Sequence, residues 1–263
     1  MDTQTSVQNR LTELFQKKGK NLLNIYFTAG YPGVDDTCKI IKALDESGAD
    51  MIEIGMPFSD PLADGPTIQK SSELALENGM TIKLLFEQLK SIRNEVSLPI
   101  LLMGYLNPVL QYGIEAFCKK CAEVGIDGII LPDLPFDEYN ERYKQIFEAN
   151  NLSNVFLVTP QTSPQRLKKI DESTQGFIYV VSTNSTTGNS KSIQDAKEYF
   201  ESIQNANLAN PYMIGFNIHD KETFEFATKY AHGAIIGSAF IKMLTDSKNL
   251  ETDIKSFISS IKG

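Results

Sequence analysis

Short apolar runs rich in β-branched residues alternate with longer amphipathic segments along most of the 263-residue chain. Almost every position within a run is apolar, which is typical of strands that are buried on both faces. The amphipathic segments carry apolar residues at intervals of three and four, the spacing of one helix face. Eight runs therefore predict strands, at 24–29, 51–55, 99–105, 128–133, 155–160, 177–182, 212–216 and 233–238.

Glycines mark the ends of several predicted helices. The segments 35–50, 113–127 and 163–176 each contain a helical pattern that ends at a glycine, the residue best suited to the left-handed position that closes a helix. Helix, glycine and strand therefore recur as a unit. Strict alternation of strands and helices implies parallel strands joined by right-handed crossovers.

Such units close most economically into a (β/α)8 barrel, and barrels of about 250 residues are commonly one domain. An open, doubly wound parallel sheet is the alternative, because the pattern fits both. No linker, charge block or low-complexity stretch interrupts the chain, so we expect a single domain over residues 1–263. Two extra helices are predicted: an amphipathic one within residues 1–20, and one after the second strand, within the long stretch 56–98.

Composition excludes several classes of protein. Lys and Arg number 25 and Asp and Glu 33, and the net charge of −8 disfavours binding to a nucleic-acid backbone. The first residues lack the apolar core of a signal peptide, and no segment approaches the about 20 apolar residues of a membrane span.

The chain has three cysteines, Cys38, Cys118 and Cys121. Because this number is odd, we expect reduced thiols and a cytoplasmic protein. Cys118 and Cys121 form a CxxC pair in a helical pattern, which favours packing over metal binding.

Glu53 is a carboxylate inside the otherwise apolar strand MIEIG. The loops at the carboxyl ends of barrel strands build the active site, so polar residues near these ends are candidates for chemistry. Alternation places Glu53 on one face with Met51 and Gly55. Burial raises the pKa of a carboxyl group and lets it exchange protons near neutral pH. Glu53 is therefore a candidate acid or base, the alternative being a glutamate that is solvated or paired with a cation.

The segment that follows, MPFSDPLADGPTIQ, carries Asp60 and Asp64 between prolines that restrict the backbone. Glu53 lies at a strand end, and Asp64 lies on a loop able to fold over it. Because their environments differ, one carboxyl group can act as an acid and the other as a base. By composition alone, a proline-rich turn with surface aspartates is the simpler interpretation.

Glycines follow the last three predicted strands, in TTG at 186–188, IGFN at 214–217 and IGSAFIK at 236–242. Backbone N–H groups in such loops, with a helix opening after the last strand, form an anion site without basic side chains. Barrels often hold phosphate after strands seven and eight. Together these glycines indicate a phosphate site, although each alone fits an ordinary strand end. Aromatic residues in or beside the strands either line a pocket for a flat apolar substrate or fill the core: Tyr26, Tyr105, Tyr179 and Phe216.

These motifs stand in one collinear order that resembles the tryptophan synthase α chain family. IEIGMPFSDPLADGPTIQ is preceded by YFTAGYPG and followed by LMGYLNPVLQYGIEAF, IILPDLP, TTG and AIIGSAFIK, so the similarity runs from about Asn24 to Lys242. The PFSDPLADGP stretch is highly specific to that family. The resemblance implies a (β/α)8 barrel that acts as a lyase in tryptophan biosynthesis. It implies the retro-aldol cleavage of indole-3-glycerol phosphate to indole and glyceraldehyde 3-phosphate, without a metal or organic cofactor in this chain.

The resemblance also implies roles for particular residues. Glu53 matches the general acid/base that moves a proton to the indole ring carbon and takes one from the substrate hydroxyl. Asp64 matches the carboxylate that pairs with the indole N–H. Asp60 matches a position implicated in communication with the partner chain. The implied indole pocket comprises Tyr26, Met103, Tyr179, Thr187 and Phe216, and the implied phosphate site Gly188, Asn217, Gly237 and Ser238.

The implied partner is the β chain, which carries pyridoxal phosphate and joins indole to serine within an αββα heterotetramer. A free-standing indole-glycerol phosphate lyase and a subunit that mainly activates the β chain are the alternative functions. Two loops depart from the family pattern. Thr183 and Ser185 stand where an arginine and a glycine are common, and Asn217 stands where the strand-seven loop commonly reads GFG. Because both carboxylates are retained, these departures bear on loop closure, partner signalling and room for phosphate more than on the chemistry.

Overall fold

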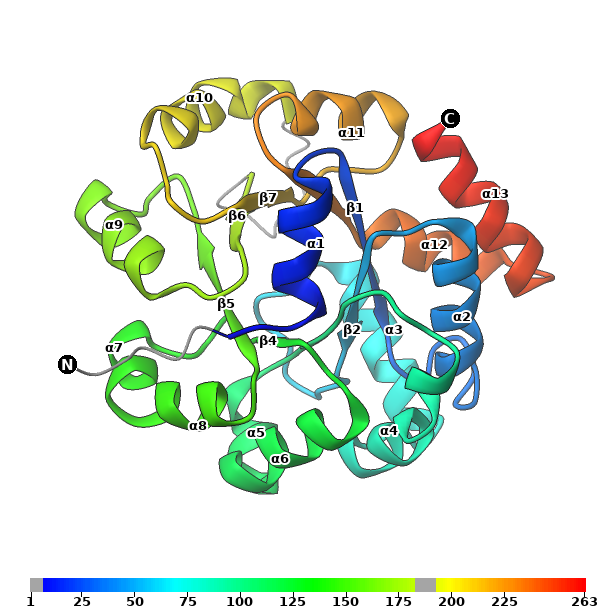
Figure 1. Cartoon of the computed structure of the whole chain (residues 1–263). Coiled ribbons are helices and arrows are strands. Elements are labelled where there is room, and N and C mark those ends of the chain that lie inside the picture. Colours follow the sequence, from blue (N-terminus) through cyan, green and yellow to red (C-terminus); the bar gives the residue numbers. More distant parts are fainter. Residues whose placement is uncertain (1–6, 183–192) are drawn as a thin grey trace.

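Eight parallel strands form one closed barrel, in which each strand pairs with its neighbours in sequence order. The computed structural model describes residues 7–182 and 193–263 (Figure 1). The predicted (β/α)8 barrel is confirmed, and closure of the sheet excludes the open, doubly wound alternative. The strands are β1 (Leu22–Thr28), β2 (Met51–Gly55), β3 (Ile100–Met103), β4 (Gly128–Ile130), β5 (Ser153–Val158), β6 (Ile178–Val181), β7 (Tyr212–Gly215) and β8 (Gly233–Ile236).

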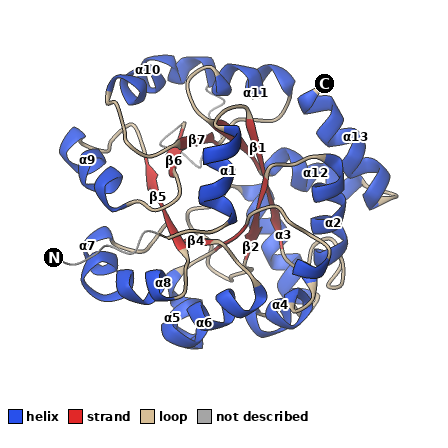
Figure 2. Ribbon diagram, viewed as in Figure 1, coloured by secondary structure: helices blue, strands red, loops and turns tan. Residues whose placement is uncertain are grey.

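Helices surround the strands on the outside of the barrel (Figure 2). Both predicted extra helices are present: α1 precedes β1, and two helices, α3 and α4, follow β2 where one would suffice. A π-helical turn at Tyr139–Tyr143 joins α7 to α8. The helices are α1 (Arg10–Lys18), α2 (Thr37–Ser47), α3 (Pro66–Glu77), α4 (Ile82–Leu89), α5 (Leu106–Tyr112), α6 (Ile114–Val124), α7 (Phe136–Glu138), α8 (Lys144–Ala149), α9 (Pro164–Ser173), α10 (Lys197–Asn205), α11 (Lys221–Thr228), α12 (Ser238–Asp246) and α13 (Leu250–Lys262).

Helix α1 covers the amino-terminal end of the barrel, where it lies in front of the strands in Figure 1. The Asn9 side chain caps α1 by accepting hydrogen bonds from the N–H groups of Leu11 and Thr12. Its Nδ2 also donates to the backbone oxygen of Asp127, just before β4, at 2.7 Å. Leu11 has no exposed surface and packs in the barrel interior. This end of the barrel is therefore closed by packing, and the opposite end is left for a site.

Two of the three predicted glycine helix ends are present. Gly48 after α2 and Gly125 after α6 adopt the left-handed conformation that closes a helix. The prediction for α9 is wrong, because that helix ends before Thr174, whose backbone is extended and whose hydroxyl donates to the Ile170 oxygen at 2.7 Å. The Thr174 hydroxyl therefore caps the end of α9, a role that Gly176 was expected to have. Gly176, with φ of 133°, lies beyond the helix.

Alternation along each strand separates two apolar clusters. One fills the barrel, and the larger one packs between the strands and the helices. Several apolar runs extend past the observed strands, because residues such as Leu131 stay buried in the outer cluster after they leave the sheet. The barrel interior includes Leu22, Met51, Leu101, Ile130, Val155, Phe177, Tyr179, Met213 and Ile235.

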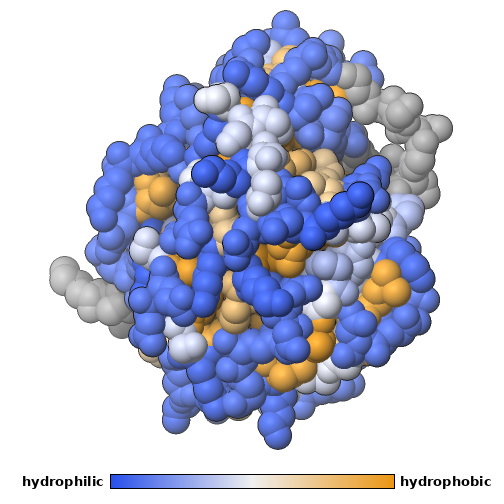
Figure 3. All heavy atoms as spheres, turned by 90° about the vertical axis from the view of Figure 1, so that its right-hand side faces the viewer, coloured by the Kyte–Doolittle hydropathy of each residue, from blue (hydrophilic) through white to orange (hydrophobic). Residues whose placement is uncertain are grey.

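The surface that Figure 3 shows is mostly hydrophilic, with apolar atoms in separate patches. Within the described ranges, no helix has both the length and the apolar character needed to cross a membrane.

Candidate active site

The carboxyl group of Glu53 lies inside the barrel, on the same face of β2 as Met51. It has no exposed surface, and Oε1 accepts a hydrogen bond from Nδ2 of Asn24 in β1 at 2.6 Å. The other oxygen, Oε2, is buried and has no hydrogen-bond partner among the described residues. Burial raises the pKa of Glu53 to about 8, and the Asn24 hydrogen bond opposes this effect only in part. Glu53 is therefore largely protonated at neutral pH and is able both to give and to take a proton.

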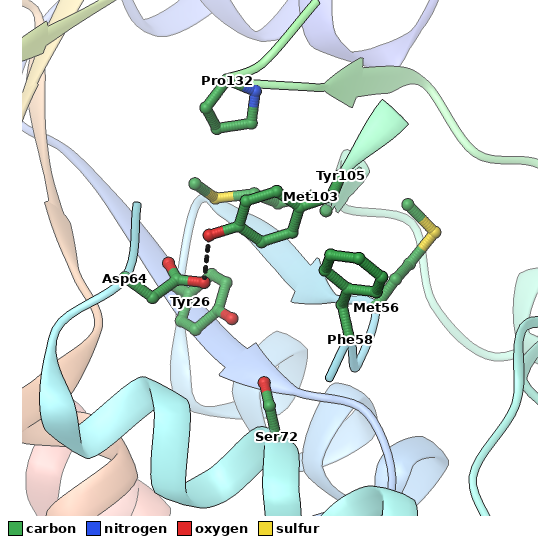
Figure 4. A pocket seen from close by; sticks show the side chains of 9 residues that line it. Tyr26, Met56, Phe58, Asp64, Ser72, Met103, Tyr105 and Pro132 are labelled. Carbon is green, nitrogen blue, oxygen red and sulfur yellow. Dashed lines mark hydrogen bonds between the residues drawn. The ribbon is translucent and has the colours of Figure 1, made fainter. Parts of the chain in front are cut away.

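Asp64 lies on the loop after β2, where its carboxylate turns toward β3 (Figure 4). Its Oδ2 accepts a hydrogen bond from the Tyr105 hydroxyl at 2.9 Å, and the same hydroxyl accepts one from the Ala63 N–H at 3.0 Å. The rings of Phe58 and Tyr105 lie 5.2 Å apart, which adds an apolar contact between the loop and Tyr105. Burial raises the pKa of Asp64 to about 6, while the Tyr105 hydrogen bond lowers it. At neutral pH this second carboxyl group is mostly ionised.

A small pocket opens beside Asp64 at the carboxyl ends of β1, β2 and β3 (Figure 4). Two residues expected in an indole pocket, Tyr26 and Met103, line it. Most of its lining residues are apolar or aromatic, and the Asp64 carboxylate and the hydroxyl groups of Ser72 and Tyr105 add polar surface. The lining residues are Tyr26, Met56, Phe58, Asp64, Ser72, Met103, Gly104, Tyr105 and Pro132.

Two buried tyrosines connect the carboxylates. Burial, with the negative charges of Asp64 and Glu53 adding to it, raises the pKa of both Tyr26 and Tyr179. Tyr26 is the partner of Glu53 in the register of β1 and β2 and lines the same pocket as Asp64, so the two carboxyl groups share one neighbourhood. Tyr179 contacts Phe216, with ring centroids 6.3 Å apart.

Glycines make room for these tyrosine rings. A Cβ atom at Gly55 would lie 2.2 Å from the Tyr26 hydroxyl oxygen, and one at Gly215 would lie 2.2 Å from that of Tyr179. Any larger residue at either position would displace a tyrosine from the site.

Two of the three glycine segments predicted to form an anion site lie where β7 and β8 end. Helix α12 begins at Ser238, directly after Gly237, and the first N–H groups of a helix have no partner within the helix, so they can bind an anion. A Cβ atom at Gly237 would lie 3.4 Å from the ring of Tyr26, which places this helix end beside the pocket. Phe216 and Asn217 both have positive φ, of 70° and 58°. Asparagine tolerates this conformation better than most residues, so Asn217 keeps a backbone shape that glycine would favour.

The remaining predicted residues are not in this group. Asp60 is exposed on the loop after β2, where its Oδ2 accepts a hydrogen bond from the Ser59 hydroxyl at 2.5 Å. Thr187 and Gly188 lie outside the described residues, as do Thr183 and Ser185.

Sequence reasoning missed Asn24. A polar residue inside an apolar strand, two positions before Tyr26 and on the same face, was the available signal.

A metal centre has no support in the part of the chain that the structure describes, where no three His, Cys, Asp or Glu side chains are placed to hold an ion. Cys118 and Cys121 are buried on α6 in the outer core, and burial raises the pKa of both thiols. Their place in the core fits the packing role that the helical pattern predicted.

Burial of Glu53 is expected to cost stability at neutral pH. Its pKa is about 8 in the folded chain against 4.5 for an exposed glutamate, so the folded state holds the extra proton between these values. Stability therefore falls as pH rises through this window. Glu53→Gln removes the effect, so its free energy of unfolding should exceed that of the parent by about 3 kcal/mol at pH 7, and by little at pH 4. Urea unfolding of both proteins at several pH values measures this difference. A constant difference across the range would contradict the raised pKa.

A (β/α)8 barrel that holds two buried carboxyl groups of raised pKa fits an enzyme of acid–base chemistry. The family model of the tryptophan synthase alpha chain matches residues 12–262. The tryptophan synthase alpha chain of Flavobacterium psychrophilum is 59% identical over 254 residues, which cover 96% of this chain and 99% of that one. That of Bacteroides thetaiotaomicron is 48% identical over 255 residues, or 97% of this chain and 100% of its own. The chain belongs to the tryptophan synthase alpha chain family.

Solved structures agree with this assignment. The aminoacrylate-bound form of tryptophan synthase from M. tuberculosis has a chain that is 31% identical, with a TM-score of 0.84 over 97% of this chain and 98% of its own. The tryptophan synthase alpha chain of Legionella pneumophila subsp. pneumophila is 29% identical, with a TM-score of 0.86 over 97% of this chain and 96% of its own. The family that the sequence resembles is thereby confirmed.

Proposed function

We propose that Glu53 and Asp64 carry out the reaction of this family, with Glu53 as the proton carrier. As a member of the tryptophan synthase alpha chain family, the protein is a lyase that cleaves indole-3-glycerol phosphate to indole and glyceraldehyde 3-phosphate. One observation carries the residue assignment. Glu53 is a carboxyl group with no exposed surface, a free Oε2 and a pKa of about 8, inside the barrel and close to the open end.

The first step is proton transfer to the indole ring. Glu53 starts as the neutral acid and gives its proton to the ring carbon that bears the glycerol phosphate side chain. The ring then carries a positive charge, which is greatest near its N–H group. Asp64, mostly ionised at neutral pH, accepts a hydrogen bond from that N–H and stabilises the cation.

The second step breaks the carbon–carbon bond. Glu53, now a carboxylate in an apolar environment, takes the proton from the adjacent side-chain hydroxyl, and that oxygen becomes the aldehyde oxygen. The electron pair of the broken bond returns to the ring and restores neutral indole. Glu53 ends protonated, as it began, so one residue serves first as acid and then as base.

The pocket and the start of α12 supply the binding contacts. Tyr26 and Met103 line the space beside Asp64. Tyr179 on β6 and Phe216 after β7 contact each other and would complete the indole pocket. The free N–H groups that follow Gly237 would bind the phosphate group of the substrate.

Gly237→Asp tests the phosphate site. A carboxylate at this position is compatible with the fold, because aspartate is a favourable residue before the first turn of a helix. Its charge would repel phosphate, so we expect KM to rise about tenfold or more with a smaller change in kcat. Gly237→Ala is the matched control, since its Cβ would make only an ordinary contact with Tyr26. Equal KM values for the two variants in steady-state assays would place the phosphate elsewhere.

The β chain is the partner of an α chain of this family, within an αββα complex. We place pyridoxal phosphate in the β chain and no cofactor in this one, since acid–base groups suffice for the cleavage. We also propose a cytoplasmic location, which the odd cysteine count supports.

Assays of indole-3-glycerol phosphate cleavage, with and without a β chain, test the proposed function. We expect turnover by the chain alone and strong activation by the β chain. High turnover without activation would support a free-standing lyase. No turnover in either setting would contradict the proposed roles of Glu53 and Asp64 and leave only a binding role.

A further inference from the structure

We propose that Asn24 is a positioning residue for Glu53, which holds Oε1 and leaves Oε2 as the oxygen that exchanges protons with the substrate. This inference rests on the proposed role of Glu53. Asn24 lies in β1 and Glu53 in β2, and the two side chains meet inside the barrel at 2.6 Å from Nδ2 to Oε1. Neither side chain has exposed surface.

The pair leaves one free oxygen on each side chain. In the described part of the chain, Oε2 of Glu53 and Oδ1 of Asn24 are buried and have no hydrogen-bond partner. Buried polar atoms without partners are rare in folded proteins, and such atoms at a candidate site indicate a role. Because Asn24 occupies Oε1, the free Oε2 is the oxygen left to meet a substrate.

An amide suits a group that must act as both acid and base. The Nδ2 group donates to the carboxylate form, and Oδ1 can accept from the protonated form after the amide turns over. A cation at this position would favour the carboxylate alone, and an apolar residue would favour the neutral acid alone. Asn24 gives either form one partner without adding charge.

The other titratable groups around Glu53 do not replace this contact. Tyr26 is the partner of Glu53 in the register of β1 and β2, Tyr179 lies on β6, and Asp64 lies on the loop after β2. Tyr26 and Tyr179 carry no charge at neutral pH, because burial raises the pKa of both hydroxyl groups. No ion pair of Glu53 is found within residues 7–182 and 193–263. In this region the Asn24 hydrogen bond is the contact that stabilises the Glu53 carboxylate.

Asn24→Leu removes the donor at nearly constant size. The neutral acid begins the reaction, so turnover by the parent should fall above about pH 8. Without the donor the carboxylate is less stable, so this alkaline limb should move up by about one pH unit. We also expect kcat to fall about tenfold or more, because a weaker acid with a less fixed carboxyl group transfers its proton more slowly. KM should change little.

Leu22→Val is the matched control for loss of packing. Leu22 lies two positions earlier on the same strand, faces the barrel interior and is fully buried. This variant should lose stability without moving the alkaline limb. Asn24→Asp keeps the shape of the side chain and replaces the donor by a second carboxyl group, so it should move the limb further up than Asn24→Leu.

A double variant separates this inference from the proposed function. Asn24→Leu should cost nothing further in the Glu53→Gln background if Asn24 acts through Glu53. Asn24 variants with the parent's pH profile, and with no more loss of kcat than Leu22→Val, would overturn the positioning role alone. Full activity of Glu53→Gln would instead overturn the proposed function.

Discussion

Glu53→Gln is expected to lower the turnover of indole-3-glycerol phosphate by about 100-fold or more. Glutamine keeps the size of the side chain and can still accept the hydrogen bond from Asn24, but it has no proton to exchange. Both proton transfers assigned to Glu53 are lost, while the phosphate and indole contacts remain. We therefore expect a large fall in kcat with little change in substrate affinity.

Steady-state assays and equilibrium binding of an inert substrate analogue separate these two effects. Glu123→Gln is the matched control, because Glu123 is exposed on α6 and pairs with Lys120 far from the barrel interior. Binding without turnover is the expected outcome for Glu53→Gln. A variant as active as the parent would show that another group carries the proton.

Asp64→Asn is expected to lower kcat by about tenfold or more, the second largest effect. Asparagine can still accept from Tyr105 and from the indole N–H, but it lacks the negative charge that stabilises the protonated ring. Since the charge develops during the reaction, the loss should appear in kcat more than in KM.

Tyr105→Phe provides the comparison for Asp64. It removes the 2.9 Å hydrogen bond to Asp64 and leaves the carboxylate in place. We expect it to lose less activity than Asp64→Asn. If both variants were equally slow, the hydrogen bond that holds the loop, and not the charge, would account for the role of Asp64.

The barrel and the inward direction of Glu53 followed from the sequence, because both depend on local periodicity. Apolar runs predicted the strands, and alternation within MIEIG put Glu53 on the face of Met51. The end of α9 did not follow, because Thr174 closes it with a side-chain hydrogen bond that competes with the glycine signal.

The contacts that shape the site lie beyond local pattern. Asp64 meets Tyr105 across 41 positions of the chain, and Asn24 meets Glu53 across 29. Such pairs arise when neighbouring strands align, and their register cannot be read from one strand alone. The left-handed conformations of Phe216 and Asn217 could not be predicted from the sequence either, since neither residue type requires them.

A crystal structure with an inert analogue, indole joined to phosphate through a plain propyl chain, tests the central claim most directly. We expect Oε2 of Glu53 to lie against the substituted ring carbon, Asp64 to accept from the ring N–H, and the phosphate to lie at the start of α12. An indole ring bound away from Glu53, with its phosphate remote from Gly237, would contradict the assignment of Glu53 as the proton carrier.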